Sequence, residues 1–318
     1  MKVLKFGGGC LKSAQDIKLL PGIVEDYYND GVFLVLSAFG KTTNLLEDNQ
    51  FDLVFDSIKN LINKLGMSPE IRRSILSLPL SPSFPYSLDY LKSFFDSCHL
   101  KPNLIKDSNN FLFYPALVSI GEYISSKIIY YYLSSVLNKS SVLLDAALCI
   151  QTDPWNSRDN AAVFKCVTID NKYSPFYGTP NKIKVDRNCI PKDKIIITQG
   201  FISSNIYHLN SGIKQLVNKQ RTTLGREGSD YSAAIFGNLL SSEEVVLFKD
   251  VNGVYNLNPK THINAKLFKA LTYEQAYDLC DSGSTIIHPK TIMHLQSKKI
   301  PLRVKNFFDL NQTGTIIS

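Results

Sequence analysis

The sequence predicts an α/β fold, a three-layer αβα sandwich with a largely parallel central sheet. Short, mostly apolar runs at Val32–Leu36, Ile195–Thr198 and Val245–Phe248 have the composition of parallel strands buried on both faces. Longer segments with helical spacing alternate with these runs, as is typical of a parallel sheet covered by helices. Glycine-rich or polar clusters follow several of the runs, at the strand ends where ligands bind in open sheets.

The expected elements follow the chain in this order. Through residue 200 we expect strands at Val3–Phe6, Val32–Leu36, Val142–Leu144, Cys149–Thr152 and Ile195–Thr198, with helices at about Ser13–Tyr28 and Ser119–Leu137. Residues 43 to 97 are mostly helical in pattern, with breaks at Pro79, Pro82 and Pro85. Later strands are expected at Val245–Phe248, Leu302–Lys305 and Thr315–Ile317, with helices from about Tyr231 and at Tyr273–Asp281 and Pro289–Ser297. No helix or strand is predicted for residues 154 to 190.

Composition excludes several classes of protein. The 318 residues suffice for one large α/β domain or two lobes, and the net charge of +7 comes from scattered lysines, so no nucleic-acid-binding stripe is expected. No apolar run reaches the length of a membrane span, and the N-terminus lacks the apolar region of a signal peptide. The six cysteines form no C-x-x-C pair, so we expect no metal site and a reducing, cytoplasmic location.

The segment Thr222–Asp230, T-T-L-G-R-E-G-S-D, is the most informative part of the chain. Small hydroxyl residues, glycines and Arg226 stand where a helix is expected to begin, and a helix start with free N–H groups attracts anions. The guanidinium of Arg226 suits a carboxylate or phosphate. Simple capping of the helix is the alternative interpretation, and it requires only Ser229 or Asp230.

Lys5 ends a strand and is followed by Gly7, Gly8 and Gly9, whose lack of side chains lets the backbone approach phosphate oxygens. A tight turn between strand and helix is the alternative. Gly40-Lys41-Thr42 imitates the end of a Walker A loop, but the full motif requires glycine at position 35, which is Val35. A P-loop NTPase is therefore excluded.

Two further clusters each allow two interpretations. Glu122 is expected in the first turn of an apolar helix, where it either stabilises the helix dipole or binds a substrate ammonium group. The segment Lys249–Lys260, which includes Asp250 and Tyr255, either holds a nucleotide or forms a β-turn with a surface tyrosine.

The order and spacing of these clusters resemble the aspartate kinases of the amino acid kinase family. The similar segments span nearly the whole chain: K-F-G-G at Lys5–Gly8, V-L-S-A at Val35–Ala38, T-N-L-L at Thr43–Leu46, G-E at Gly121–Glu122, G-F-I at Gly200–Ile202, T-T-L-G-R-E-G-S-D-Y at Thr222–Tyr231, D-V-N-G-V-Y at Asp250–Tyr255 and the H-P segment at Ser282–Thr291. The resemblance implies an amino acid kinase-like fold.

The resemblance also implies roles for individual residues. Lys5 would stabilise the transferred γ-phosphoryl group, and Asp230 would organise the catalytic lysine. The amino acid would be bound by Ser37, Thr43, Glu122, Arg226 and Ser229, with Arg226 on the α-carboxylate and Glu122 on the ammonium. The nucleotide would contact Gly7, Gly8, Lys249, Asp250, Tyr255, Lys260 and Thr285. Residues 1–203 would form an amino-acid-binding lobe and residues 204–318 a nucleotide-binding lobe.

The sequence departs from the family pattern at several of these positions. Gly9-Cys10 replaces Thr-Ser, Glu227 replaces the first glycine of R-G-G-S-D, and Thr285 replaces a lysine. Lys249 stands where the family has threonine and could supply the missing cation, while Lys260 keeps the charge of an arginine without its planar fork. Loss of one phosphate cation would cost about 2–4 kcal/mol of transition-state stabilisation.

The resemblance predicts transfer of the γ-phosphate of Mg²⁺-bound ATP to the β-carboxylate of L-aspartate, giving 4-phospho-L-aspartate, the first step of lysine, threonine and methionine synthesis. It implies a homodimer, and the match ends near Thr313–Ile317, which leaves no room for ACT regulatory domains. Two alternatives stay open: a kinase of the same family acting on another amino acid or carboxylate, and a catalytically weak binding homologue.

Overall fold

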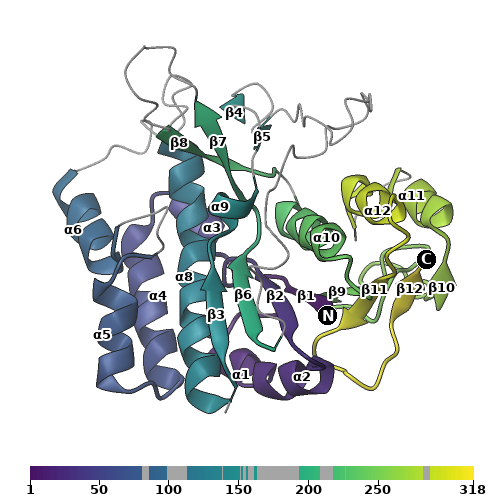
Figure 1. Cartoon of the computed structure of the whole chain (residues 1–318), viewed down its shortest axis with the longest axis horizontal. Coiled ribbons are helices and arrows are strands. Elements are labelled where there is room, and N and C mark those ends of the chain that lie inside the picture. Colours follow the sequence, from purple (N-terminus) through teal and green to yellow (C-terminus); the bar gives the residue numbers. More distant parts are fainter. Residues whose placement is uncertain are drawn as a thin grey trace.

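A computed structural model describes residues 1–80, 86–98, 113–137, 139–150, 152, 155–156, 161–162, 193–207, 218–225, 227–281 and 287–318. Its centre is an eight-stranded sheet with the strand order β10-β12-β11-β9-β1-β2-β6-β3 (Figure 1). The strands are β1 (Lys2–Phe6), β2 (Val32–Leu36), β3 (Ser141–Leu144), β6 (Ile195–Gln199), β9 (Val245–Lys249), β10 (Ala270–Leu271), β11 (Leu302–Asn306) and β12 (Thr315–Ile317). Every pairing is parallel except that of β11 with β12, so the predicted sheet is confirmed.

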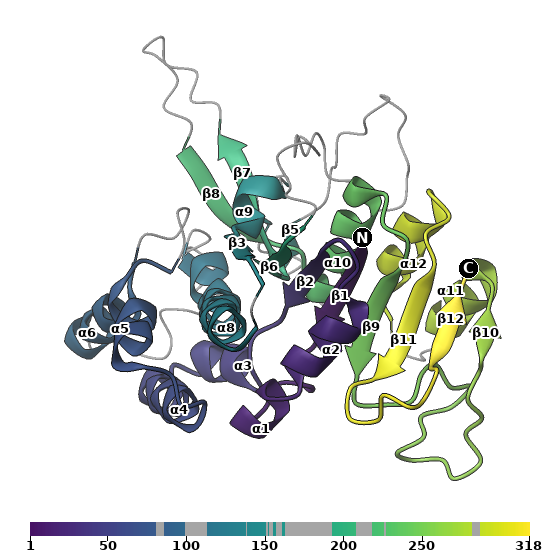
Figure 2. The same ribbon diagram turned by 60° about the horizontal axis from the view of Figure 1, so that its bottom comes forward.

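Helices cover both faces of this sheet (Figure 2). One face carries α2 (Leu20–Tyr27) and α8 (Phe113–Val136), which contact each other, and the opposite face carries α10 (Gly228–Leu240), packed against α12 (Pro289–Gln296) and followed outward by α11 (Tyr273–Asp281). In the strand order, the step from β1 to β2 and the step from β6 to β9 run in opposite directions along the sheet. Because crossovers between parallel strands are right-handed, the helices of these two connections lie on opposite faces. The predicted three-layer sandwich is therefore confirmed.

The remaining elements extend these layers. They are α1 (Ala14–Ile17), α3 (Thr42–Glu47), α4 (Phe51–Lys64), α5 (Pro69–Ser77), α6 (Leu88–Cys98) and α9 (Ala146–Cys149), together with the pairs β4 (Trp155–Asn156)–β5 (Ala161–Ala162) and β7 (Ile202–Tyr207)–β8 (Asn218–Thr223). The β7–β8 hairpin was not predicted. No helix in the described part of the chain is long and apolar enough to cross a lipid bilayer.

Three sequence predictions differ from the structure. The helix expected at Ser13–Tyr28 is divided into α1 and α2, because Pro21 in the first turn of α2 lacks the N–H that would continue the first helix. The strand expected at Cys149–Thr152 is wrong at its start, since Cys149 ends α9, whose first turn is capped by Asp145. Ile150 and Thr152 do exchange backbone hydrogen bonds with Ser204 of β7, which accounts for their strand-like pattern.

The third difference concerns Glu122. The expected helix start near Ser119 is wrong, because α8 begins at Phe113, and Glu122 therefore lies well inside a 24-residue helix. A carboxylate in this position gains little from the helix dipole, whose effect is confined to the first turn. Stabilisation of the helix dipole therefore does not explain a glutamate at position 122.

The core explains why the strand ends are well ordered. All five residues of β2 and of β6 are buried, as are most of β1 and β9. The rings of Phe6 and Phe248 stack across neighbouring strands with centroids 4.9 Å apart, and Phe307 packs edge-on against both. Such aromatic contacts add to the free energy gained from burial.

Gly200 brings the end of β6 directly against the start of α10. A Cβ atom at Gly200 would lie 2.5 Å from Cβ and 2.6 Å from Oγ of Ser229. No side chain can be accommodated at that distance, so glycine at this position sets how close the helix start comes to the sheet edge.

We therefore expect Gly200→Ala to displace Ser229 and to lower the free energy of unfolding by about 1–3 kcal/mol, the usual cost of overpacking. Urea unfolding of the variant measures this loss. Gly22→Ala is the matched control, because a Cβ there meets no atom within 4 Å and Gly22 is inside a helix, where alanine is preferred. Equal stability of the two variants would contradict the packing argument.

Candidate active site

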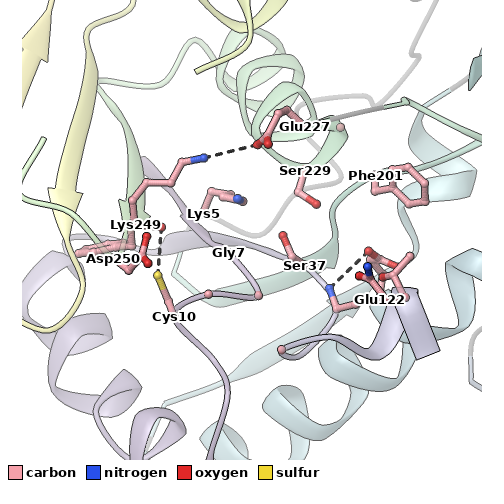
Figure 3. Close-up of a pocket in the computed structure, with 18 of the residues that line it drawn as sticks. Lys5, Gly7, Cys10, Ser37, Glu122, Phe201, Glu227, Ser229, Lys249 and Asp250 are labelled. Atoms are coloured by element: carbon pink, nitrogen blue, oxygen red, sulfur yellow. Dashed lines mark hydrogen bonds and ion pairs between the residues drawn. The ribbon is translucent and has the colours of Figure 1, made fainter. Parts of the chain in front are cut away.

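Four neighbouring strands end at one edge of the sheet. Lys5 and Phe6 end β1, and Gly7 follows; Ser37 follows β2, Gly200 follows β6 and Asp250 follows β9. Because these strands are parallel, their carboxyl ends meet there, and the start of α10 reaches the same edge. A cavity of about 580 Å³ lies between them (Figure 3).

Asp230, near the start of α10, is fully buried and is paired with two lysines that line the cavity. Its Oδ1 lies 2.6 Å from Nζ of Lys5, and its Oδ2 lies 2.6 Å from Nζ of Lys249. Burial opposes ionisation of Asp230, but the two ammonium groups outweigh it and hold the pKa of that carboxyl below its usual range. Burial also opposes the charge on Lys249, yet Asp230 and Glu227 raise its pKa. Lys249 therefore stays positively charged at the cavity.

Glu122 has the opposite situation. Its side chain is buried, the backbone N–H of Ala38 donates to Oε1 at 3.3 Å, and Oε2 has no hydrogen-bond partner among the described residues. Burial raises the pKa of Glu122 from 4.5 to about 8, and backbone hydrogen bonds offset this only in part. A cation brought to Oε2 would stabilise the ionised carboxylate. The site is thus suited to bind a positively charged group at Glu122.

Several other predicted residues of the two substrate sites lie around the same cavity. Gly7 and Gly8 line it from the loop after β1, and a Cβ at Gly8 would lie 2.6 Å from the carbonyl oxygen of Ala38. Ser37, Thr43 and Ser229 line it from three further segments. The structure therefore brings together residues that are up to 245 positions apart, Lys5 and Asp250, into one site.

Some predicted residues are not placed there. Lys260 does not line the cavity and reaches it only through Asp250, whose Oδ2 lies 2.8 Å from Nζ of Lys260. Tyr255 forms an isolated β-bridge with Leu267 and does not line the cavity either. Arg226 and Thr285 lie outside the described residues. The substrate contacts expected of these four residues stay predictions.

Sequence reasoning missed other residues that line the cavity, among them Asn44 and Phe201. Asn44 follows the selected Thr43, and Phe201 lies in the G-F-I segment, so proximity in sequence was the available signal. Cys10 and Glu227, which the sequence identified as departures from the family pattern, line the cavity as well. The thiol of Cys10 donates to the carbonyl oxygen of Phe248 at 3.3 Å, and burial raises its pKa to about 11. The Cys10 thiol is therefore disfavoured as a thiolate, the form in which cysteine is a nucleophile.

Comparison with known proteins agrees with this geometry. The sequence model of the amino acid kinase family matches residues 1–306. Bifunctional aspartokinase/homoserine dehydrogenase 2 of Arabidopsis thaliana is 26% identical over 325 residues, covering 99% of this chain and 32% of that protein. Aspartokinase 1 of the same plant is 28% identical over 322 residues, covering 99% of this chain and 52% of that protein. The chain thus spans about a third to a half of these relatives.

Solved structures share the fold. Escherichia coli aspartokinase III, crystallised with aspartate and ADP, superimposes with a TM-score of 0.72 at 22% identity, over 100% of this chain and 64% of that chain. An isopentenyl phosphate kinase has a TM-score of 0.54 at 14% identity, with 100% of both chains covered. Since the family pattern extends over nearly all of the sequence, this chain belongs to the amino acid kinase family.

Proposed function

We propose that this chain transfers the γ-phosphoryl group of ATP to the β-carboxylate of L-aspartate and releases ADP and 4-phospho-L-aspartate. One observation carries the proposal: a single cavity has two lysines paired with Asp230 toward one side, and toward the other a buried carboxylate that meets no cation among the described residues (Figure 3). The first side suits an anion, and the second suits an ammonium group. The similarity to proteins named aspartokinase favours aspartate as the acceptor.

On the nucleotide side, Gly7 and Gly8 let the backbone come close to the phosphates, and Lys249 and Asp250 end the neighbouring strand. Glu122, Ser37 and Thr43 belong to residues 1–203, and Lys249 and Asp250 to residues 204–318. With Gly7, Gly8, Arg226 and Ser229 as exceptions, this division supports an amino-acid side formed mainly by residues 1–203 and a nucleotide side formed mainly by residues 204–318. One continuous sheet contains strands from both parts.

The chemistry requires alignment of two anions more than it requires a base. A carboxylate oxygen of the acceptor attacks the γ-phosphorus, the bond from that phosphorus to the bridging oxygen breaks, and ADP leaves with the electron pair. Lys5 and Lys249 would offset the charge that develops on the transferred group, and Asp230 fixes both ammonium groups in advance. Glu122 would hold the α-ammonium and Arg226 the α-carboxylate, with Ser37, Thr43 and Ser229 completing the polar contacts.

The residues at the cavity fit Mg²⁺ that enters with the nucleotide. Within the described ranges no group of three or more His, Cys, Asp or Glu side chains could hold a metal ion, whereas Mg²⁺ in kinases binds mainly through substrate phosphates and water. Asp250, whose side chain is 40% exposed at the cavity, would be its protein ligand. When bound, Mg²⁺ neutralises phosphate charge.

An acceptor panel tests the proposed function. ADP release would be measured with L-aspartate, L-glutamate, succinate, UMP and isopentenyl phosphate, and hydroxylamine would trap any acyl phosphate. We expect turnover with aspartate, a trapped hydroxamate, and little turnover of succinate, which lacks the ammonium that Glu122 would bind. Faster turnover of a different carboxylate would replace aspartate as the acceptor, and turnover of a phosphate acceptor alone would refute the reaction type.

Lys5→Met should lower kcat about a hundredfold or more, because one preorganised cation facing the transferred group is lost. Lys2→Met is the matched control, since Lys2 begins the same strand at the opposite edge of the sheet. Steady-state kinetics and thermal melts of both variants separate catalysis from folding. Turnover of Lys5→Met close to wild type would exclude the proposed role.

Arg226→Ala should raise the KM for the amino acid about ten- to a hundredfold and change the KM for ATP far less, because a charge-assisted hydrogen-bonding partner of the α-carboxylate is removed. Both constants come from the same coupled assay. A larger effect on ATP would place Arg226 on the nucleotide side instead.

Glu122→Gln should change how stability depends on pH in the ligand-free protein. The pKa of Glu122 is raised on folding, so its contribution is fully present below about pH 4.5 and is lost as the pH rises toward 8. Relative to the glutamine variant, wild type should lose on the order of 1 kcal/mol per pH unit between pH 5 and pH 8. Urea unfolding at four pH values measures the difference, and parallel curves would disprove the raised pKa.

A further inference from the structure

Lys249 has two carboxylate neighbours of different character. Asp230 lies 2.6 Å from its Nζ and is fully buried, whereas Oε2 of Glu227 lies 3.6 Å away and the Glu227 side chain is 38% exposed (Figure 3). The first contact is a short, dehydrated ion pair, and the second exceeds the length of a hydrogen bond and borders on water. Of these two partners of Lys249, Glu227 is therefore the one that an incoming anion can replace.

The backbone of Glu227 also sets it apart. Its φ of 56° and ψ of 22° lie in the left-handed region, which side chains other than glycine rarely adopt. It directly precedes Gly228, the first residue of α10, yet its side chain makes no capping hydrogen bond to the helix. Neither helix capping nor backbone preference explains a glutamate at this position. Its side chain instead lies at the cavity wall facing Lys249.

We propose that Glu227 is a place-holding anion: its carboxylate neutralises Lys249 while the site is empty, and the polyphosphate of the nucleotide displaces it. This inference rests on the proposed function only in that the phosphates bind at Lys249. Glu227 then weakens nucleotide binding, because the nucleotide must break an existing ion pair and bring its charge close to a carboxylate. The residue would set the affinity for ATP without contacting the amino acid.

Nucleotide affinity of Glu227→Gln tests the proposal. Calorimetric titration with ATP and with ADP, each with Mg²⁺ and with EDTA, should give a Kd about two- to fivefold lower than in wild type, the range expected for losing one exposed ion pair. The gain should shrink at high salt, since the Glu227 side of the pair is exposed to solvent. Glu25→Gln, on the exposed surface of α2, is the matched control and should leave Kd unchanged.

Other results would overturn the proposal in distinguishable ways. Weaker binding of the variant only in the presence of Mg²⁺ would make Glu227 a metal ligand, and an unchanged Kd would make it a surface residue without effect. In the Lys249→Met background the gain from Glu227→Gln should shrink, because only the repulsion between Glu227 and the phosphates is left to remove, and an undiminished gain would refute the partnership with Lys249. The Kd for the nucleotide is measured without turnover, so the test of Glu227 is valid even if aspartate is not the acceptor. If neither wild type nor Glu227→Gln binds a nucleotide, both the proposed function and the role of Glu227 are refuted.

Discussion

The site depends on one buried carboxylate, Asp230, held between the ammonium groups of Lys5 and Lys249. Two lysines directed at one cavity would repel each other, and a lone buried aspartate would be strongly disfavoured. Together they are stable only in this geometry, which requires β1 and β9 to be neighbours and α10 to pack across both. The strand order of the sheet is therefore the structural condition for the charge arrangement of the cavity.

The two buried carboxylates of the site differ in a way that separates its two sides. Asp230 already has its cations, so its charge is fixed and its role is to hold other groups in place. Glu122 faces no cation among the described residues, and its pKa of about 8 shows how unfavourable its charge is there. A ligand that supplies an ammonium group satisfies the second carboxylate and leaves the first undisturbed. The two ends of the cavity thus differ in charge compensation, which is complete at Asp230 and lacking at Glu122 among the described residues.

Much of this could be predicted from the sequence, because short apolar runs followed by glycine or hydroxyl residues identify parallel strands that end at a ligand site. Val32–Leu36 followed by Ser37 is such a case, and both are placed as expected. The helix position of Glu122 was predicted wrongly, since apolar residues before Ser119 fit a helix and a loop equally well. The contact between Lys5 and Asp230 could not be predicted by periodicity at all, because it follows from which strands are neighbours.

Glu227 and Lys249 show why departures from a family pattern are best interpreted in pairs. Taken separately, glutamate in place of glycine adds a negative charge beside anionic substrates, and lysine in place of threonine adds a positive one. In the structure the two side chains meet at 3.6 Å, so the net charge of the cavity is unchanged by the two substitutions together. Either one alone would leave a partly buried, uncompensated charge next to Asp230. The pair therefore acts as one change, which adds a cation to the cavity and places a carboxylate beside it in the ligand-free protein.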